Sequence, residues 1–121
     1  MQENYHKFAR DLADIIDDDR IITDPLRTLA FGTDASFYRL IPQIVVTVIN
    51  EVEVQAILSL AHQHGVHLTF RAAGTSLSGQ AVTDGVLVRL GNGWNQAQVL
   101  NGGAQLKVEP GVIGARANQI L

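Results

Sequence analysis

One stretch near the middle of the chain limits its fold more than any other. Residues 43–49 are mostly apolar and β-branched, which is typical of a buried strand, and Asn50 follows as a helix cap. Residues 52–64 then repeat apolar side chains at helical spacing and end before Gly65. Residues 67–70 form a second short strand candidate. This order predicts a βαβ unit whose two parallel strands pair in one sheet through a right-handed crossover.

The N-terminal third is expected to be less regular. Residues 3–17 repeat apolar side chains at helical spacing and predict an amphipathic helix. Three consecutive aspartates, residues 17–19, oppose the helix dipole and mark its end. Residues 20–42 contain turn signals at Asp24-Pro25 and Gly32, and we expect an irregular segment.

The C-terminal third carries strand signals. Residues 85–90 form an apolar run, and residues 94–100 and 105–108 flank an Asn-Gly-Gly sequence that is typical of a β-hairpin. Residues 114–121 begin a helical pattern. The pattern is still apolar at Leu121, so we expect the sequence to be a piece of a longer protein.

Composition narrows the function classes. The 121 residues suffice for one small domain, with 46% hydrophobic and 17% charged residues. The net charge of −3 and the lack of a basic stripe argue against a nucleic-acid partner. There is no cysteine to form a disulfide or ligate an iron–sulfur cluster, and no apolar run of about 20 residues to span a bilayer.

The stretch with the most chemistry follows the second strand of the βαβ unit. Residues 70–81 contain two glycines, three hydroxyl residues, Arg71 and no carboxylate. Free backbone N–H groups and hydroxyls in such a loop suit a phosphate or pyrophosphate, and parallel sheets place ligands at the carboxyl ends of their strands. The alternative is an ordinary polar turn between two strands.

Two groups of residues resemble metal ligands but are interpreted otherwise. The aspartates at residues 17–19 are adjacent and point in different directions, so we interpret them as a solvated helix end. His62, His64 and His67 have no nearby carboxylate or cysteine to complete a ligand set. We therefore expect no metal site.

Several motifs in order resemble the FAD-binding domain of the vanillyl-alcohol-oxidase, or PCMH-type, flavoenzymes. Besides the βαβ unit they are Gly-Thr-Ser-Leu-Ser-Gly at residues 74–79, Gly-Thr-Asp-Ala-Ser-Phe-Tyr at residues 32–38, and Glu-Pro-Gly-Val at residues 109–112. The chain is most similar to the branch that contains D-lactate dehydrogenase, the flavin subunit of glycolate oxidase and D-2-hydroxyglutarate dehydrogenase. The loop departs from the commonest family form, which has glycine near Ala72 and a second glycine at Gln80.

The resemblance implies an α+β fold with an α/β-like βαβ start. It would be the N-terminal lobe of a PCMH-type FAD-binding domain, truncated at its C-terminus. Residues 1–40 would form the N-terminal helix and the segment that leads into the sheet, and residues 41–121 the incomplete first lobe.

The resemblance also implies a cofactor and its contacts. FAD would bind without a covalent link, because Thr75 and Ser76 stand where some relatives carry a flavin-linked histidine. Backbone N–H groups of residues 73–76 would bind the pyrophosphate. The expected cofactor-binding residues are Arg71, Ala73, Gly74, Thr75, Ser76, Ser78 and Gly79. For Arg71, a structural ion pair is the alternative.

For the parent protein the resemblance implies an FAD-dependent oxidoreductase that acts on the CH–OH group of a small 2-hydroxy acid. No residue of this chain is expected to be catalytic, because the family's catalytic histidines and substrate-binding cap lie beyond Leu121, as would any iron–sulfur motifs. The chain alone is expected to be inactive. We expect a cytoplasmic parent, or one that is peripheral to a membrane.

Two other functions stay open at this point. One is a non-redox module that binds a nucleotide or an anion. The other is a catalytically silent truncated domain that forms a homo-oligomer through apolar residues such as Val112 and Leu121.

Overall fold

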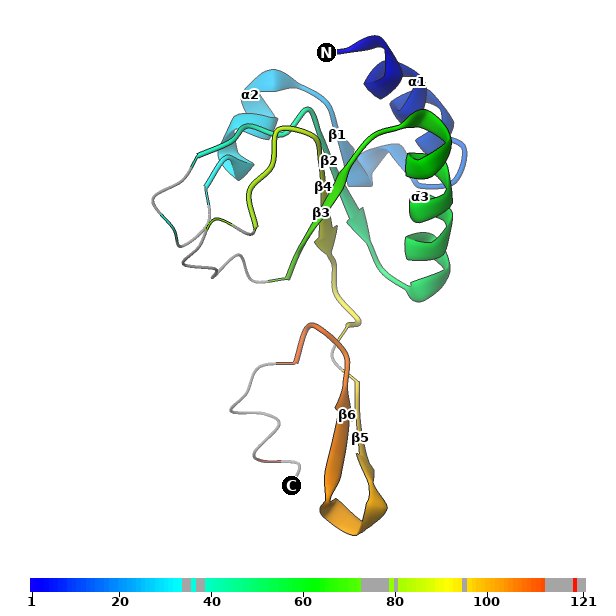
Figure 1. Ribbon diagram of the computed structural model, residues 1–121, viewed down its shortest axis with the longest axis vertical. Coiled ribbons are helices and arrows are strands. Elements are labelled where there is room, and N and C mark those ends of the chain that lie inside the picture. Colours follow the sequence, from blue (N-terminus) through cyan, green and yellow to red (C-terminus); the bar gives the residue numbers. More distant parts are fainter. Residues whose placement is uncertain are drawn as a thin grey trace.

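The computed structural model describes residues 1–33, 36, 39–72, 79, 81–94, 96–112 and 119. Three α-helices and six strands lie within these residues (Figure 1). The helices are α1 (Glu3–Leu12), α2 (Pro25–Thr28) and α3 (Glu51–His64). The strands are β1 (Ile21–Ile22), β2 (Ile44–Val48), β3 (Leu68–Arg71), β4 (Val86–Leu90), β5 (Ala97–Leu100) and β6 (Gln105–Val108).

The central βαβ unit forms largely as its sequence predicts. The side chain of Asn50 accepts a hydrogen bond from the Glu53 backbone N–H at 2.9 Å and caps α3. The helix ends at Gly65, whose φ of +65° is the left-handed conformation that glycine adopts without strain. The prediction of two parallel strands in one sheet around α3 is confirmed.

The prediction that these two strands, β2 and β3, pair directly is wrong, because β4 lies between them. The sheet order is β1–β2–β4–β3, and β4 is parallel to both β2 and β3. Burial gives the physical reason: Val86, Leu87 and Val88 of β4 are fully buried, as befits a central strand of a parallel sheet. By contrast Phe70 of β3 is 42% exposed, which an edge strand tolerates.

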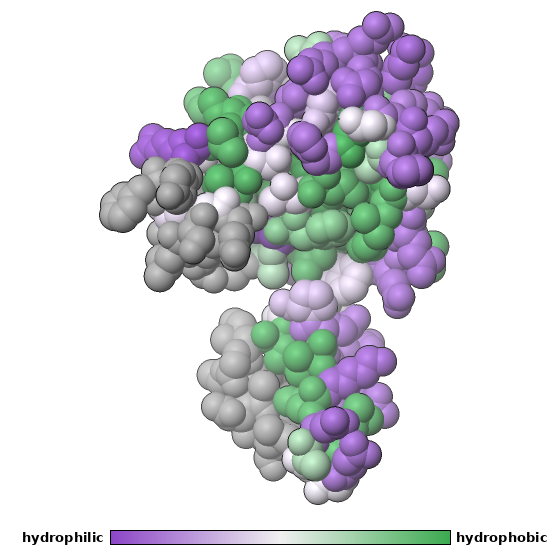
Figure 2. Space-filling model, in the orientation of Figure 1, coloured by the Kyte–Doolittle hydropathy of each residue, from purple (hydrophilic) through white to green (hydrophobic). Residues whose placement is uncertain are grey.

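Both faces of the sheet are covered (Figure 1). On one face α1 and α3 pack over alternate strand residues, and hydrophilic side chains gather over the outer side of these helices (Figure 2). This core includes Phe8, Leu12, Ile44, Val46, Val48, Ile57, Val86 and Val88. The opposite face buries Val45 and Leu87, and α2 and the irregular segments lie on that side (Figure 1).

The N-terminal third differs from expectation in two places. The helix α1 ends at Leu12 rather than near residue 17, because the chain turns there and brings Ile16 into the core at 3% exposure. The segment predicted to be irregular contains β1 and the one-turn helix α2. Asp24 caps α2 by accepting the Leu26 N–H at 3.1 Å, and Pro25 fills its first position.

An ion pair joins this N-terminal segment to the start of α3. Arg20 donates from both terminal nitrogens to the Glu53 carboxylate at 2.7 Å, and also to the Thr47 carbonyl at 3.2 Å. Glu53 additionally accepts the Ile49 N–H at 2.9 Å. The hydrogen bonds from Arg20 lower the pKa of the Glu53 carboxyl from its ordinary 4.5, against the opposing effect of burial.

The hairpin β5–β6 projects from the sheet on a short connection (Figure 1). Its antiparallel register confirms the predicted hairpin, although β5 begins at Ala97 rather than Trp94. The Trp94 indole N–H donates to the Val48 carbonyl at 3.0 Å, and the Gly111 N–H donates to the Trp94 carbonyl. A Cβ at Gly111 would overlap with that carbonyl, so this junction requires glycine.

We predict that Glu53→Gln lowers the free energy of unfolding at pH 7 by about 1.5–3 kcal/mol, the usual contribution of hydrogen bonds to charged groups. A carboxyl with a lowered folded pKa stabilises above its unfolded pKa, so the difference from wild type should disappear as the pH falls below 4.5 and through the folded value. Denaturant unfolding at several pH values measures this. Glu51→Gln, in the same helical turn but exposed, is the control and should change little. Equal effects of the two substitutions would contradict the assigned role.

We predict that Gly111→Ala separates the hairpin from the sheet. The added Cβ displaces the Trp94 carbonyl and with it the indole bond to Val48. Trp94 is the chain's one tryptophan, so its emission should move to longer wavelength as the indole gains water. Gly102→Asn is the matched control, because a Cβ at this position in the hairpin turn would have no atom within 4 Å and asparagine tolerates the left-handed conformation. An unchanged emission spectrum in Gly111→Ala would show that the junction tolerates a side chain.

Candidate functional site

The predicted phosphate loop leaves the carboxyl end of β3. Of the seven residues expected to contact the cofactor, the structure describes Arg71 and Gly79. The other five, Ala73, Gly74, Thr75, Ser76 and Ser78, lie outside the described residues, and their contacts stay predictions. Gly79 has a φ of +75°, a left-handed conformation that favours glycine.

The connection that contains this loop is longer than a turn between two strands. Because β3 and β4 are parallel neighbours, residues 72–85 must return from the carboxyl end of β3 to the start of β4. Three consecutive residues of this connection are buried: Ala81, Val82 and Thr83 are each less than 9% exposed. The Thr83 hydroxyl accepts the Gly85 N–H at 3.0 Å, immediately before β4 begins.

Arg71, the last residue of β3, connects three backbone segments. Its Nε donates to the Ala81 carbonyl at 3.0 Å, and one terminal nitrogen donates to the same oxygen. That nitrogen also donates to the Thr33 carbonyl at 2.8 Å and to the Phe31 carbonyl at 3.3 Å. The guanidinium therefore bridges the two ends of residues 72–80 and joins them to the segment before β2.

A second arginine lies beside Arg71. Arg89 of β4 is its register partner, so both side chains leave the same face of the sheet near the carboxyl ends of the strands. The Arg89 guanidinium lies over the Phe31 ring, 4.7 Å from its centroid. Two permanent positive charges at this edge favour a negatively charged ligand. Sequence reasoning missed Arg89 and Phe31, since only their register and contacts bring them to the loop.

On the helix side of the same edge is an apolar hollow. Its volume is about 350 Å³, and it lies between the end of β3 and the hairpin junction. The residues that line it are Val54, Phe70, Ala72, Leu90, Trp94 and Pro110. The strand edge is therefore polar and basic on one face and apolar on the other.

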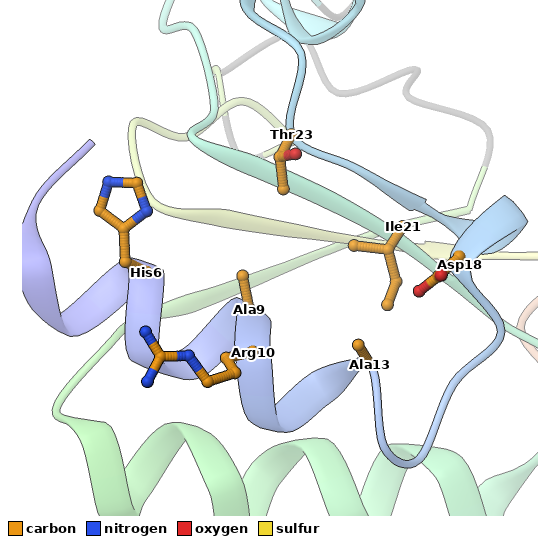
Figure 3. Close-up of a pocket in the computed structure, with 7 residues that line it drawn as sticks. All are labelled: His6, Ala9, Arg10, Ala13, Asp18, Ile21 and Thr23. Atoms are coloured by element: carbon orange, nitrogen blue, oxygen red, sulfur yellow. The ribbon is translucent and has the colours of Figure 1, made fainter.

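A groove of about 500 Å³ between α1 and β1 has a different character (Figure 3). Figure 3 shows the small side chains of Ala9 and Ala13 pointing toward β1, where Ile21 lies opposite Ala13. Small residues at this seam leave the space unfilled. The groove lies along the edge strand β1, on the far side of the sheet order from β3 and its loop.

The histidines singled out in the sequence do not gather. His64 contacts the Asp11 carboxylate at 2.7 Å, which joins α3 to α1. Across the described part of the chain, no three His, Cys, Asp or Glu side chains are arranged to bind a metal ion. None of the described helices has the length and apolar character needed to cross a bilayer.

Comparison with known proteins gives the family. The model of the FAD binding domain family matches residues 42–121. D-2-hydroxyglutarate dehydrogenase of Escherichia coli (strain K12) is 34% identical over 97 residues, which cover 77% of this chain and 10% of that protein. The chain thus spans about a tenth of the length of this relative.

Solved structures share the fold at low identity. An alkyldihydroxyacetonephosphate synthase matches with a TM-score of 0.74 and 16% identity over 96% of this chain and 24% of its own. A p-cresol methylhydroxylase matches with a TM-score of 0.72 and 14% identity over 99% and 25%. A 6-hydroxy-D-nicotine oxidase from Arthrobacter nicotinovorans matches with a TM-score of 0.64 and 19% identity, over 83% of this chain and 22% of its own. The mixed α/β arrangement and the family match agree, and the chain belongs to the FAD binding domain family.

Proposed function

We propose that this chain supplies the pyrophosphate-binding part of an FAD-dependent dehydrogenase that oxidises a D-2-hydroxy acid. The observation that carries the proposal is the position of the Gly-Thr-Ser-Leu-Ser-Gly loop. It leaves the carboxyl end of a parallel strand in a chain of the FAD binding domain family, and Arg71 bonds its base to the rest of the domain. The similarity to D-2-hydroxyglutarate dehydrogenase supports the 2-hydroxy acid as substrate class.

The described residues fit such a group in two ways. Residues 70–81 contain no carboxylate, while Arg71 and Arg89 place two positive charges at the edge where the loop begins. The left-handed Gly79 lets the backbone approach a ligand without a Cβ in between. The two charges favour a bound pyrophosphate over an uncharged ligand, and Gly79 allows the cofactor to approach the backbone closely.

Within this proposal, the backbone N–H groups of Ala73, Gly74, Thr75 and Ser76 bind the pyrophosphate without a covalent link to the flavin. Ser78 and Gly79 lie toward the isoalloxazine. The chemistry that FAD supplies is acceptance of a hydride from the α-carbon of the hydroxy acid. This chain's residues bind and orient the cofactor, and the catalytic residues come from elsewhere in the enzyme.

We predict that Gly74→Asp lowers flavin binding at least tenfold in the enzyme that contains this domain. The substitution adds a Cβ where the backbone approaches a phosphate, and its charge repels the pyrophosphate by about 1 kcal/mol at 4 Å in water and several-fold more in a drier site. A tenfold loss corresponds to about 1.4 kcal/mol. Flavin absorbance of the purified proteins measures it.

The control for that experiment is Gly102→Asp, which adds the same charge in the hairpin turn, where a Cβ would have no atom within 4 Å. This variant should retain the wild-type flavin content. Equal flavin content in wild type and Gly74→Asp would remove the loop as the pyrophosphate site and with it the proposed function.

We also propose that the 121-residue chain self-associates through the hairpin. Opposite residues in the register, Ala97 with Val108 and Val99 with Leu106, form an apolar face, and Val99 and Val108 are 44% and 45% exposed. Val99→Lys should reduce the mass measured by light scattering at high protein concentration. Gln98→Lys, on the opposite face, is the control and should leave the mass unchanged. A monomeric wild type would contradict this proposal.

A further inference from the structure

Arg71 is the last residue of β3, and its side chain contacts segments that are far apart in the sequence. The Ala81 carbonyl, which accepts two of its bonds, lies where the chain enters the buried return to β4. Arg71 and Ala81 therefore bracket residues 72–80, and the guanidinium closes this span at its base. The length of the remaining loop is set by this contact rather than by the strand ends alone.

The same guanidinium lies at the base of a second loop. It donates to the Thr33 carbonyl, and Thr33 forms an isolated antiparallel bridge with Arg39. The Leu40 N–H donates to the Gly32 carbonyl at 3.2 Å and continues that pairing. Residues 33 and 39 thus bracket another short span. The Arg71 guanidinium donates hydrogen bonds at the base of this span and at the base of residues 72–80.

The geometry points to Arg71 as a positioning residue that fixes the bases of these two spans against each other. The inference rests on the proposed function, because the loop that Arg71 brackets is the proposed pyrophosphate site. This role differs from a direct phosphate contact, since the described hydrogen bonds of the guanidinium go to backbone carbonyl oxygens. Arginine suits this role because its planar group presents several N–H donors in a fixed arrangement, whereas lysine carries one compact ammonium.

The two roles differ in what a lysine would do. If Arg71 bound the pyrophosphate through its charge, Arg71→Lys would keep much of the affinity that Arg71→Met loses. If Arg71 fixes the loop bases, lysine fails for two reasons: it has no second donor nitrogen to replace the Nε bond to Ala81, and its shorter side chain does not reach the point from which the Arg71 terminal nitrogen bonds the Phe31, Thr33 and Ala81 carbonyls. Both variants should then raise the dissociation constant of FAD at least tenfold and to a similar extent. Titration of the apoenzyme with FAD measures both values.

Arg89 supplies the matched control. It carries the same charge on the neighbouring strand and the same sheet face, but its guanidinium lies over the Phe31 ring. Arg89→Lys and Arg89→Met should therefore raise the dissociation constant less than the Arg71 variants. Equal losses at the two positions, or a near-wild-type Arg71→Lys, would overturn the positioning role.

A second measurement needs neither FAD nor a variant that folds. In the wild-type full chain, a bonded Arg71 Nε–H should exchange with solvent at least tenfold more slowly than that of the exposed Arg10 on α1, as observed by NMR at neutral pH. Where the variants fold, backbone amides at residues 31–33 and 81–83 should exchange faster than in wild type. An Arg71 Nε–H that exchanges as fast as that of Arg10 would overturn the inference. If the Arg71 Nε–H exchanges slowly but the enzyme binds no FAD, the positioning role of Arg71 stands and the proposed function is refuted.

Discussion

The parallel order of β2, β4 and β3 is the constraint on which the rest of this structure depends. Parallel strands cannot be joined by a two-residue turn, because each connection must return the length of the sheet. One connection becomes α3, whose apolar residues cover the sheet. The other, residues 72–85, begins with the glycine- and hydroxyl-rich loop and ends as a buried segment at Ala81–Thr83. The loop therefore lies at the carboxyl edge as a direct result of strand order.

Ordering a long connection loses conformational entropy, and the hydrogen bonds of one side chain, Arg71, offset part of that loss. Fixing the backbone of a residue costs roughly 1–2 kcal/mol, and a hydrogen bond to a charged group contributes about 1.5–3 kcal/mol. Because Arg71 donates to Ala81, Thr33 and Phe31, its bonds can offset the ordering of a few residues at the bases of the two spans. Under the proposed function, a bound pyrophosphate would contribute the additional hydrogen bonds to the N–H groups between them.

Local sequence signals made the central βαβ unit predictable, whereas the long-range contacts could not be predicted. Asn50 and Gly65 mark the ends of α3 through their own capping chemistry, so the helix was predicted almost to the residue. The two-residue strand β1 and the one-turn helix α2 are too short to show a period, and Asp24-Pro25 was interpreted as a turn rather than a cap. The pairing of β2 with β4, and the Phe31 and Thr33 carbonyl partners of Arg71, join segments about 40 residues apart, for which a local pattern carries no signal.

The fold of this chain is shared by proteins with different names. Structures whose names describe a synthase, a hydroxylase and an oxidase share this arrangement at identities of 14–19%. Identity this low leaves few side chains in common, so what these proteins share with the chain is the fold. A fold does not fix a reaction, and different chemistries can share one cofactor-binding framework. In this chain the side chain of Arg71 bonds the two ends of the loop that we propose binds FAD to the segment before β2, and so ties the loop to the shared fold.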